Sequence, residues 1–416
     1  MSGQIDSSAA CQSMAGSGTA HTRIKVAVVV NFLTSYREGF YERLLRADGI
    51  DLMIYCHAPP SHLNLTSIHL KFPGHVQLLD GKFLFGEKIV FSSIPWKELL
   101  TQYDTVFIEG NPRYLSMALL ATRLQLAGRR VVLWTMVHSF RPSRLGLMLR
   151  MAWNRIFDRL LVYSDTEAQF LKDRGLRGHI VGINNGVDID RINQSIEPWH
   201  PAALRQWQKE NNLTGKIVLL SCARLEKKNK FEQVITALEQ VVLHAPSAVW
   251  CVIGGGAEQA ALEDLTQRSG LQSHVRFLGP IYDENFQAPW FLSARILVHS
   301  GAIGLTLLHA MGYGVPVITH DAASHHGPEF AAFVNGQHGA SYPEDSIEAL
   351  GNTISRLLDD PAHCASLGAA GRRVVVDRYN TNVMVDRFLS MVDRNTLIGG
   401  APSPHAPTQT QDEPHG

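Results

Sequence analysis

The sequence predicts an α/β protein of two doubly wound, Rossmann-like domains, each a parallel sheet covered by helices on both faces. Short β-branched runs such as RIKVAVVV and DTVFIEG alternate with longer amphipathic stretches such as REGFYERLLRA. Near-continuous apolar strands joined by helices are typical of parallel sheets buried on both sides. The alternation stops over residues 191–212, which mix prolines, tryptophans and charges, and then restarts. The 416 residues are enough to give two domains a sizeable core each.

The first domain is expected over residues 23–190, with strands in RIKVAVVV, DLMIYC, DTVFIEG, RRVVLWTMVH, DRLLVYS and HIVGINNGV. Helical stretches lie between them, and PRYLSMALLATRLQLAG ends at Gly128, a residue type that stops helices. The second domain is expected over residues 213–378, with strands in KIVLLSCA, AVWCVIGGG, HVRFLGPI, ARILVHS and VPVITH. Residues 191–212 are predicted to be a linker, and a helix over residues 379–395 to cross back to the first domain.

Composition and charge exclude several classes of protein. Lysine plus arginine equals aspartate plus glutamate, at 38 each, so the net charge indicates neither nucleic acid nor a uniformly anionic partner. No apolar run approaches the ~20 residues that cross a bilayer. The ends, 1–22 and 396–416, are predicted to be disordered tails, and the first is a poor signal peptide. The five cysteines match neither metal-ligand nor disulfide patterns, so a reducing cytosol is expected.

Four stretches of the second domain follow predicted strands, where open α/β sheets bind ligands. In SCARLEKKNKF, Arg224 and Lys230 lie in a loop that opens a helix. Positive charge there is unfavourable unless an anion is present, so a diphosphate site is predicted, with a solvated basic turn as the alternative. In CVIGGGAEQ, Gly254 and Gly256 allow a ligand to approach the backbone, although glycines also serve tight turns.

The stretch SGAIGLTLLHAM is predicted to be a glycine-rich turn that opens a helix. Gly301 and Gly304 would leave the N–H groups of Gly304, Leu305 and Thr306 free to bind phosphate or sugar hydroxyls. His309 lies in an apolar helix and is either a hydrogen-bonded core residue or a ligand for a hydroxyl.

The fourth stretch, HDAASHHGPEF, contains His320, His325, His326 and Glu329. Its spacing does not match that of metalloproteases. A polar loop lining the cleft between the domains is therefore favoured over a zinc site, and no metal is expected.

In this order and spacing, ARLEKKNK, GGGAEQAAL, VRFLG, SGAIGLTLLHAM and GYGVPVITH resemble the second domain of GT-B glycosyltransferases, particularly the retaining family 4. The resemblance implies two Rossmann-like domains that face a central cleft. It also implies transfer of a sugar from a nucleotide diphospho-sugar, which is a substrate, so no cofactor is expected.

The resemblance further implies roles for single residues. Arg224 and Lys230 would stabilise the donor diphosphate, and the backbone of Ile281 would contact the base. The turn Gly301–Thr306 would contact phosphate and sugar. In VVLWTMVHSF of the first domain, His138 would contact the donor sugar beside its anomeric carbon; by itself it could equally be a structural histidine.

The sequence departs from the family within this site. The family's two glutamates, separated by seven residues, fall on Gly301 and His309, and its lysine falls on Asn229, next to Lys230. His309 is then expected to bind ribose in place of a glutamate, and the hexose contact has to come from backbone or elsewhere. The site is predicted to be divergent but active.

The predicted function is metal-independent glycosyl transfer with retention, in the cytoplasm, to a polysaccharide, a lipid-linked acceptor or another glycoconjugate. The alternatives are a nucleotide-sugar-binding protein without catalysis and a UDP-sugar epimerase. The stretch RPSRLGLMLRMAWNRIFDR carries five arginines and one aspartate. It is interpreted either as a domain helix with a basic solvent face or as a helix that rests on the inner membrane to reach a lipid-linked acceptor.

Overall fold

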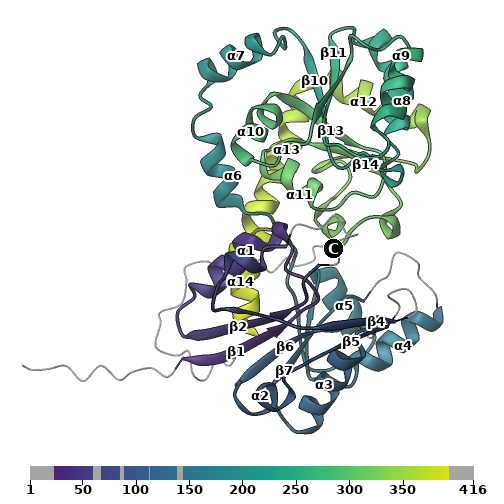
Figure 1. Ribbon diagram of the computed structural model, residues 1–416. Coiled ribbons are helices and arrows are strands. Elements are labelled where there is room, and N and C mark those ends of the chain that lie inside the picture. Colours follow the sequence, from purple (N-terminus) through teal and green to yellow (C-terminus); the bar gives the residue numbers. More distant parts are fainter. Residues whose placement is uncertain (1–22, 60–66, 85–88, 112, 138–143, 393–416) are drawn as a thin grey trace, which may run out of the picture.

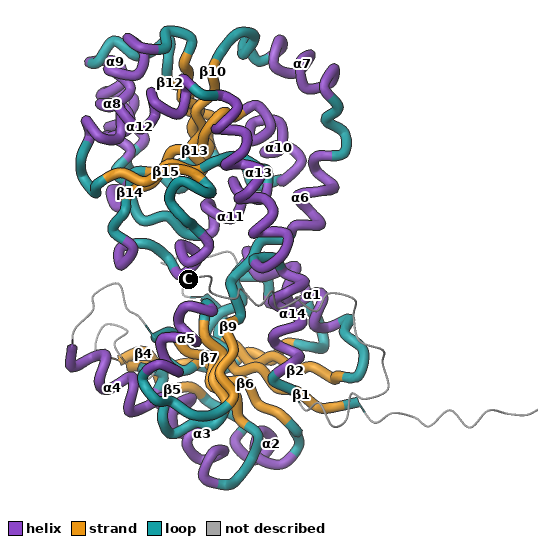
Figure 2. The backbone as a smooth tube through the Cα atoms, turned by 180° about the vertical axis from the view of Figure 1, so that it is seen from behind, coloured by secondary structure: helices purple, strands orange, loops and turns teal. Residues whose placement is uncertain are grey.

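The computed structural model describes residues 23–59, 67–84, 89–111, 113–137 and 144–392. They form two lobes, one above the other in Figure 1, and each lobe is built around a parallel sheet, drawn in orange in Figure 2. Buried apolar side chains pack on both faces of each sheet, so each lobe has its own core. This is the doubly wound arrangement that the alternating apolar runs predict.

The first lobe contains a seven-stranded sheet in the order β3-β2-β1-β6-β7-β8-β9. Its strands are β1 (Ile24–Val29), β2 (Ile50–Cys56), β3 (Val76–Leu78), β6 (Thr105–Glu109), β7 (Val131–Thr135), β8 (Arg159–Val162) and β9 (His179–Gly182). A hairpin of β4 (Gly81–Leu84) and β5 (Ile89–Ser92) lies beside the sheet. The helices are α1 (Glu38–Leu45), α2 (Trp96–Thr101), α3 (Leu115–Leu126), α4 (Arg144–Asn154) and α5 (Asp165–Asp173).

The second lobe contains a six-stranded sheet in the order β12-β11-β10-β13-β14-β15. Its strands are β10 (Ile217–Cys222), β11 (Ala248–Ile253), β12 (Val275–Gly279), β13 (Ala294–His299), β14 (Val317–His320) and β15 (Gly339–Tyr342). The helices are α8 (Phe231–His244), α9 (Gln259–Arg268), α10 (Glu284–Ser293), α11 (Leu305–Gly312), α12 (Ile347–Asp359) and α13 (Pro361–Arg378).

The segment between the sheets is helical. Residues 191–212, predicted from the sequence to be a linker, hold most of α6 (Ile189–Ile196) and all of α7 (Pro201–Glu210). Trp207 of α7 packs edge-on against Trp290 of α10, with ring centroids 4.8 Å apart. The tryptophans that interrupt the apolar rhythm of the sequence thus anchor this segment to the second lobe.

The chain crosses between the lobes twice, and the two crossings lie side by side. The N–H of Val187 donates to the carbonyl of Tyr379 at 3.2 Å, and the N–H of Thr381 donates to the carbonyl of Val187 at 3.0 Å. After the second crossing, α14 (Thr381–Ser390) lies against α1 in the first lobe (Figure 1). Phe388 of α14 stacks on Phe107 of β6, with ring centroids 3.8 Å apart.

Candidate active site

Two loops at the carboxyl edge of the second sheet are bound to each other. The hydroxyl of Ser300, after β13, lies 3.0 Å from the carbonyl oxygen of Asn229 and 2.8 Å from that of Lys230. Thr306 Oγ1 donates to the carbonyl of Cys222 at 2.9 Å. The structure therefore joins the loop after β10 and the turn after β13 into one surface, at the edge where open α/β sheets bind ligands.

Helix α11 begins at this surface with Gly304 as its N-cap. Within the described part of the chain, no group accepts a hydrogen bond from the N–H of Gly304, Leu305 or Thr306. Free N–H groups at a helix start, together with the positive end of the helix dipole, favour an anion.

Gly301 has no room for a side chain. A Cβ placed on it would clash with the carbonyl oxygen of Lys228 and lie 2.5 Å from the Cα of Asn229. Because these contacts are with backbone, a larger residue requires the loop after β10 to move. The position where the family's first glutamate falls is therefore filled here by the neighbouring loop.

Gly254 and Gly256 support the loop after β10. A Cβ on Gly254 would clash with the carbonyl oxygen of Ala223, and one on Gly256 with that of Leu225. The N–H of Leu225 donates to the carbonyl of Gly255 at 3.0 Å. This close packing requires glycine at both positions whether or not a ligand approaches.

Arg224 extends from this supported loop into solvent. Its side chain is 61% exposed, and Nη1 lies 2.9 Å from Glu226 Oε1. Lys228 Nζ lies 2.9 Å from the other carboxylate oxygen of Glu226. Exposed ion pairs contribute about 0–1 kcal/mol, so an incoming diphosphate can replace Glu226 at low cost.

Lys230 is held more firmly. Its Nζ lies 2.6 Å from Asp345 Oδ1 and 3.1 Å from Glu344 Oε1. Burial opposes its charge, but the hydrogen bonds to Asp345 and Glu344 outweigh that effect and raise the pKa of Lys230. The ammonium group stays charged, yet two carboxylates already neutralise its field.

The polar ring of His309 in an apolar helix has a carboxylate partner. Its Nε2 donates to Glu284 Oε1 of α10 at 2.7 Å, and the hydroxyl of Tyr313 donates to the same oxygen at 2.6 Å. Burial opposes the ionisation of Glu284, but these two hydrogen bonds keep the pKa of Glu284 below its usual value. One nitrogen of His309 is thus already used, which leaves Nδ1 for a ligand.

A hydrogen-bonded chain links the two lobes beside the turn after β13. Glu329 is 6% exposed, and its Oε1 accepts from Asn185 Nδ2 at 2.9 Å. The amide oxygen of Asn185, Oδ1, accepts from Arg37 Nη2 at 3.3 Å, and the Arg37 guanidinium lies 4.5 Å above the ring of Trp134. Sequence reasoning missed Arg37 and Asn185, although both follow strands of the first sheet.

His326, after β14, holds the turn after β13 and is itself bound to His320 at the end of that strand. His326 Nδ1 accepts from the N–H of Ile303 at 3.1 Å, and its Nε2 donates to the carbonyl of His320 at 2.9 Å. The two rings stack with centroids 3.9 Å apart. In the part of the chain that the structure describes, no group of three or more His, Cys, Asp or Glu side chains could hold a metal ion.

The structure describes Ile281, one of the two remaining predicted site residues, but not His138. Ile281 follows β12, and its carbonyl accepts from Gln287 Nε2 at 2.5 Å. Its N–H has no partner among the described residues, so that atom is open to a ligand. His138 lies outside the described residues.

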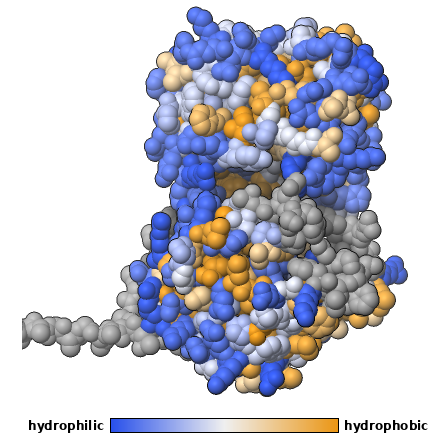
Figure 3. Space-filling model, viewed as in Figure 1, coloured by the Kyte–Doolittle hydropathy of each residue, from blue (hydrophilic) through white to orange (hydrophobic). Residues whose placement is uncertain are grey.

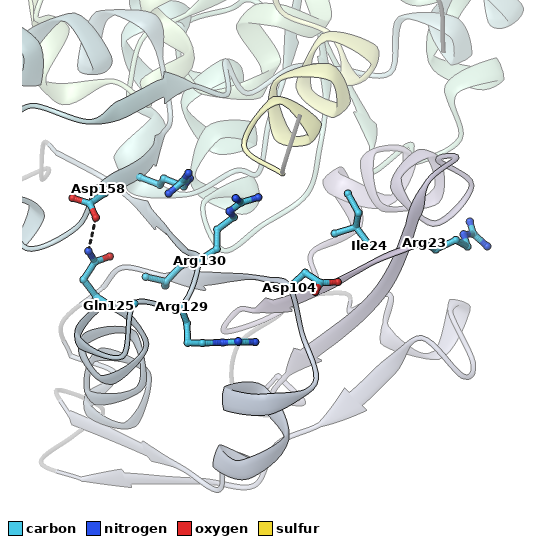
Figure 4. A pocket seen from close by; sticks show the side chains of 10 residues that line it. Arg23, Ile24, Asp104, Gln125, Arg129, Arg130 and Asp158 are labelled. Atoms are coloured by element: carbon cyan, nitrogen blue, oxygen red, sulfur yellow. Dashed lines mark hydrogen bonds between the residues drawn. The ribbon is translucent and has the colours of Figure 1, made fainter. Parts of the chain in front are cut away.

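A cavity of 510 Å³ lies at the opposite, amino edge of the first sheet. Figure 4 shows its arginines spread along that edge, with Arg23 at one end and Arg129 pointing away from Arg130. Arg129 donates to the carbonyl of Tyr103 at 2.8 Å, and Arg23 to that of Ala47 at 3.3 Å. These side chains support the strand starts and do not belong to the candidate site.

Comparison with known proteins places the chain among enzymes. A family model described as glycosyl transferases group 1 matches residues 205–374. Over 286 residues the chain is 27% identical to a GDP-mannose-dependent alpha-(1-6)-phosphatidylinositol monomannoside mannosyltransferase of Mycobacterium tuberculosis, covering 65% of this chain and 72% of that one. It is 29% identical over 203 residues to a glycogen synthase of the same species, covering 48% and 45%.

Solved structures resemble the whole described fold. Anabaena HepE, solved in complex with UDP, matches with a TM-score of 0.65 at 15% identity, covering 88% of this chain and 98% of that one. Sucrose-phosphate synthase from Thermosynechococcus elongatus matches with a TM-score of 0.61 at 18% identity, covering 89% and 98%. At these identities the likeness shows the fold alone.

Two Rossmann-like lobes with these structural neighbours define the GT-B fold, and the matched domain defines the chain as a glycosyltransferase. Residues 205–374 form a glycosyl transferases group 1 domain. The family resemblance predicted from the five stretches between Arg224 and His320 is confirmed.

Proposed function

We propose that this glycosyltransferase moves a sugar from a nucleotide diphospho-sugar to a glycan or lipid-linked acceptor, with retention and without a metal ion. The proposal rests on the surface formed by the loop after β10 and the turn after β13. Asn229 connects its two parts, because its amide donates to the carbonyl of Arg224 at 2.6 Å while its own carbonyl binds Ser300. The Arg224 guanidinium therefore lies on one side of the hydrogen-bonded link through Asn229 and Ser300, and the three free N–H groups at the start of α11 lie on the other.

In this mechanism the protein stabilises the leaving group. The diphosphate gains negative charge as the bond to the sugar breaks, and donors already in place lower the energy of that charge. Arg224 exchanges Glu226 for the diphosphate and carries most of the stabilisation, and the free N–H groups add to it. Lys230 contributes less, since Glu344 and Asp345 keep their contacts with it.

The sugar and the nucleoside lie on either side of the diphosphate in the proposed complex. Glu329, whose Oε2 would lie 3.7 Å from a Cβ on Gly304, accepts a hydroxyl of the donor sugar, and His138 contacts the same sugar from the first lobe. Backbone of Ile281 contacts the base, and His309 offers Nδ1 to the ribose. GDP-mannose, the donor named for the mycobacterial relative, is the first donor to test, followed by UDP-glucose.

Replacement of Arg224 tests the proposal. Arg224→Ala is expected to lower kcat/KM for transfer by about a hundredfold or more, because a charge-stabilising donor is lost. The matched control is Arg268→Ala on α9, whose side chain is 67% exposed and paired with Asp264. Full activity in Arg224→Ala would overturn the assignment. The anomeric configuration of the product, read by NMR, tests retention, and activity after dialysis against a chelator tests metal independence.

The two alternative functions have distinct outcomes. Mass spectrometry of nucleotide sugars that co-purify with the chain identifies the donor for these assays. Thermal stabilisation by that donor without product, over a broad acceptor panel, would indicate a binding protein. Conversion of the donor sugar without any acceptor would indicate an epimerase.

On the acceptor side, we propose that α4 contacts the cytoplasmic face of the membrane. Leu145, Met148 and Leu149 are 66%, 68% and 63% exposed, and their spacing places them on one face of the helix. Arg144 and Arg150 accompany them, and α4 contains no acidic residue. An apolar helix face with flanking arginines fits an anionic lipid surface. None of the described helices is long and apolar enough to cross a membrane.

A further inference from the structure

A second cavity, of 640 Å³, opens on the flank of the second lobe between α7 and α10, which lie side by side in Figure 1. Five aromatic side chains line it, and we refer to them as the aromatic groove: Trp199, Trp207, Tyr282, Phe286 and Trp290. Its volume is within the range of pockets that hold small organic ligands.

The rings of the aromatic groove form a stepped surface. Trp207 stands nearly perpendicular to Trp290, at 87° and 4.8 Å between centroids, and at 75° and 6.1 Å to Trp199. Tyr282 and Phe286 stand at its mouth and are 88% and 68% exposed. Large aromatic side chains gathered at the surface are typical of binding sites.

Apart from Asp283, the polar groups of the groove are neutral donors and acceptors. Among the described residues, none accepts a hydrogen bond from the indole N–H of Trp199, Trp207 or Trp290. The amides of Asn211 and Asn285 stand at the rim. Asp283 is the one charged residue of the lining, and its carboxylate already accepts from the N–H of Asn285 as the cap of α10. No cation lines the cavity, so a diphosphate has no partner there.

The aromatic groove and the candidate active site lie on different faces of α10. Glu284 and Phe291 face α11, where they meet His309 and Tyr313. Phe286 and Trp290 face α7 instead. A ligand of the groove therefore lies on the other face of α10 from the diphosphate surface, although Ile281, which is proposed to contact the base, also lines the cavity.

We propose that the aromatic groove binds a neutral oligosaccharide, at a site separate from the transfer reaction. The C–H faces of a pyranose ring pack on aromatic faces, whose electron density attracts the weakly positive hydrogens. Its hydroxyls accept from indole N–H groups and exchange hydrogen bonds with the rim amides. Bound there, an acceptor or product glycan stays attached to the enzyme between transfer events. This role goes beyond the proposed function, which supplies the reason why glycans are present.

The test uses the full chain and three neutral polysaccharides: dextran, yeast mannan and glycogen. Native electrophoresis through gels that contain each polysaccharide measures binding as retarded migration. We expect retardation by at least one of them. The double variant Tyr282→Ala/Phe286→Ala is expected to bind roughly tenfold more weakly, because two ring contacts are lost. Since both side chains are exposed, the variant is expected to fold.

Two controls separate the groove from the rest of the molecule. Leu126→Ala/Leu243→Ala removes apolar side chains that are 81% and 86% exposed elsewhere and should leave retardation unchanged. Arg224→Ala should also keep retardation while it loses transfer, so failure of the proposed function and failure of this inference are distinguishable.

Three outcomes would overturn the inference. The first is migration unaffected by all three polysaccharides. The second is loss of UDP and GDP binding together with glycan binding in Tyr282→Ala/Phe286→Ala, which would assign the groove to the nucleotide site. The third is binding of a synthetic peptide of residues 401–416 to the wild type and not to this variant, which would assign the groove to a proline-rich segment.

Discussion

A single side chain, His326, connects the chemistry of the site to the pH. Both of its ring nitrogens are used in the neutral form, since Nδ1 accepts from Ile303 and Nε2 donates to His320. A proton on Nδ1 would place two N–H groups against each other and free the turn after β13. Burial lowers the pKa of His326 from 6.5 to about 4, so the folded protein keeps the ring neutral in mild acid.

His326 is therefore expected to make stability depend on pH. Between pH 6.5 and about 4 the histidine is protonated in the unfolded chain but stays neutral in the folded protein. Its contribution to the free energy of unfolding is therefore full above pH 6.5 and is lost as the pH drops toward 4. In His326→Gln the slope of unfolding free energy against pH in this window should become shallower, by up to ~1.4 kcal/mol per pH unit. Urea titrations at several pH values measure it.

The control for this experiment is His363→Gln, because His363 is exposed on α13. The slope of unfolding free energy against pH in this variant should equal that of the wild type. A residual slope is expected in His326→Gln, since burial also lowers the pKa of His299 to about 4. An unchanged slope in His326→Gln would show that the ring does not titrate as its contacts imply.

At the scale of elements, the sequence predicted those strands whose own residues form a recognisable apolar pattern. Strands such as β1, β6 and β10 could be predicted because each is a mostly apolar run rich in β-branched residues or leucine. The short strands β3 and β15 could not, since VQL and GASY carry little pattern, and they exist through pairing with β2 and β14.

In the candidate site, too, features set by local sequence could be predicted and features set by distant contacts could not. The loop of Arg224 and the turn at Gly304 could be predicted because each follows an apolar strand. The carboxylate that faces His309 comes from α10, and the backbone that excludes a side chain at Gly301 comes from the loop after β10. Such contacts join segments far apart in the sequence, and no local pattern encodes them.

Helix α4 is predicted to bind the membrane surface through its exposed apolar side chains. Figure 3 shows apolar surface at the lower right of the first lobe, on the side where Figure 1 places α4. The triple variant Leu145→Gln/Met148→Gln/Leu149→Gln is expected to bind vesicles that contain phosphatidylglycerol at least about tenfold more weakly, because three apolar side chains lose their lipid contact. Co-sedimentation measures the bound fraction.

Leu243→Gln on α8, at a side chain 86% exposed in the second lobe, is the matched control and should sediment like the wild type. If the wild type binds vesicles of phosphatidylcholine and of phosphatidylglycerol equally weakly, α4 is an ordinary domain helix with a basic solvent face.

At the scale of the whole molecule, the first lobe is completed by the last described helix. Phe388 of α14 is fully buried and stacks on Phe107, and Met384 and Met391 belong to the same core. Arg387 strengthens the attachment through Asp165 of α5, at 2.6 Å between Nη1 and Oδ1. The first lobe thus depends on a segment that lies about two hundred residues beyond its sheet in the sequence.

Phe388→Ala is expected to destabilise the first lobe by about 3–5 kcal/mol, the usual cost of truncating a buried phenylalanine. Hydrogen exchange followed by mass spectrometry should show lost protection in β1 and β6 while β10 and β11 keep theirs. Val376→Ala, at a side chain 46% exposed on α13, should change neither. Equal loss of protection in both lobes would show that they unfold as one unit.

The paired crossings at Val187 and Asn380 also decide how the molecule can move. Because the two crossing segments are hydrogen-bonded to each other, they oppose translation of one lobe relative to the other. Both can bend at the same level, so they allow a hinge rotation of the lobes. Opening is then a rotation whose amplitude grows with distance from Val187. Asn185 lies two residues from that axis and contacts Glu329 of the other lobe, so an opening moves this contact less than it moves α2 and α9, which Figure 1 draws at the bottom and the top of the molecule.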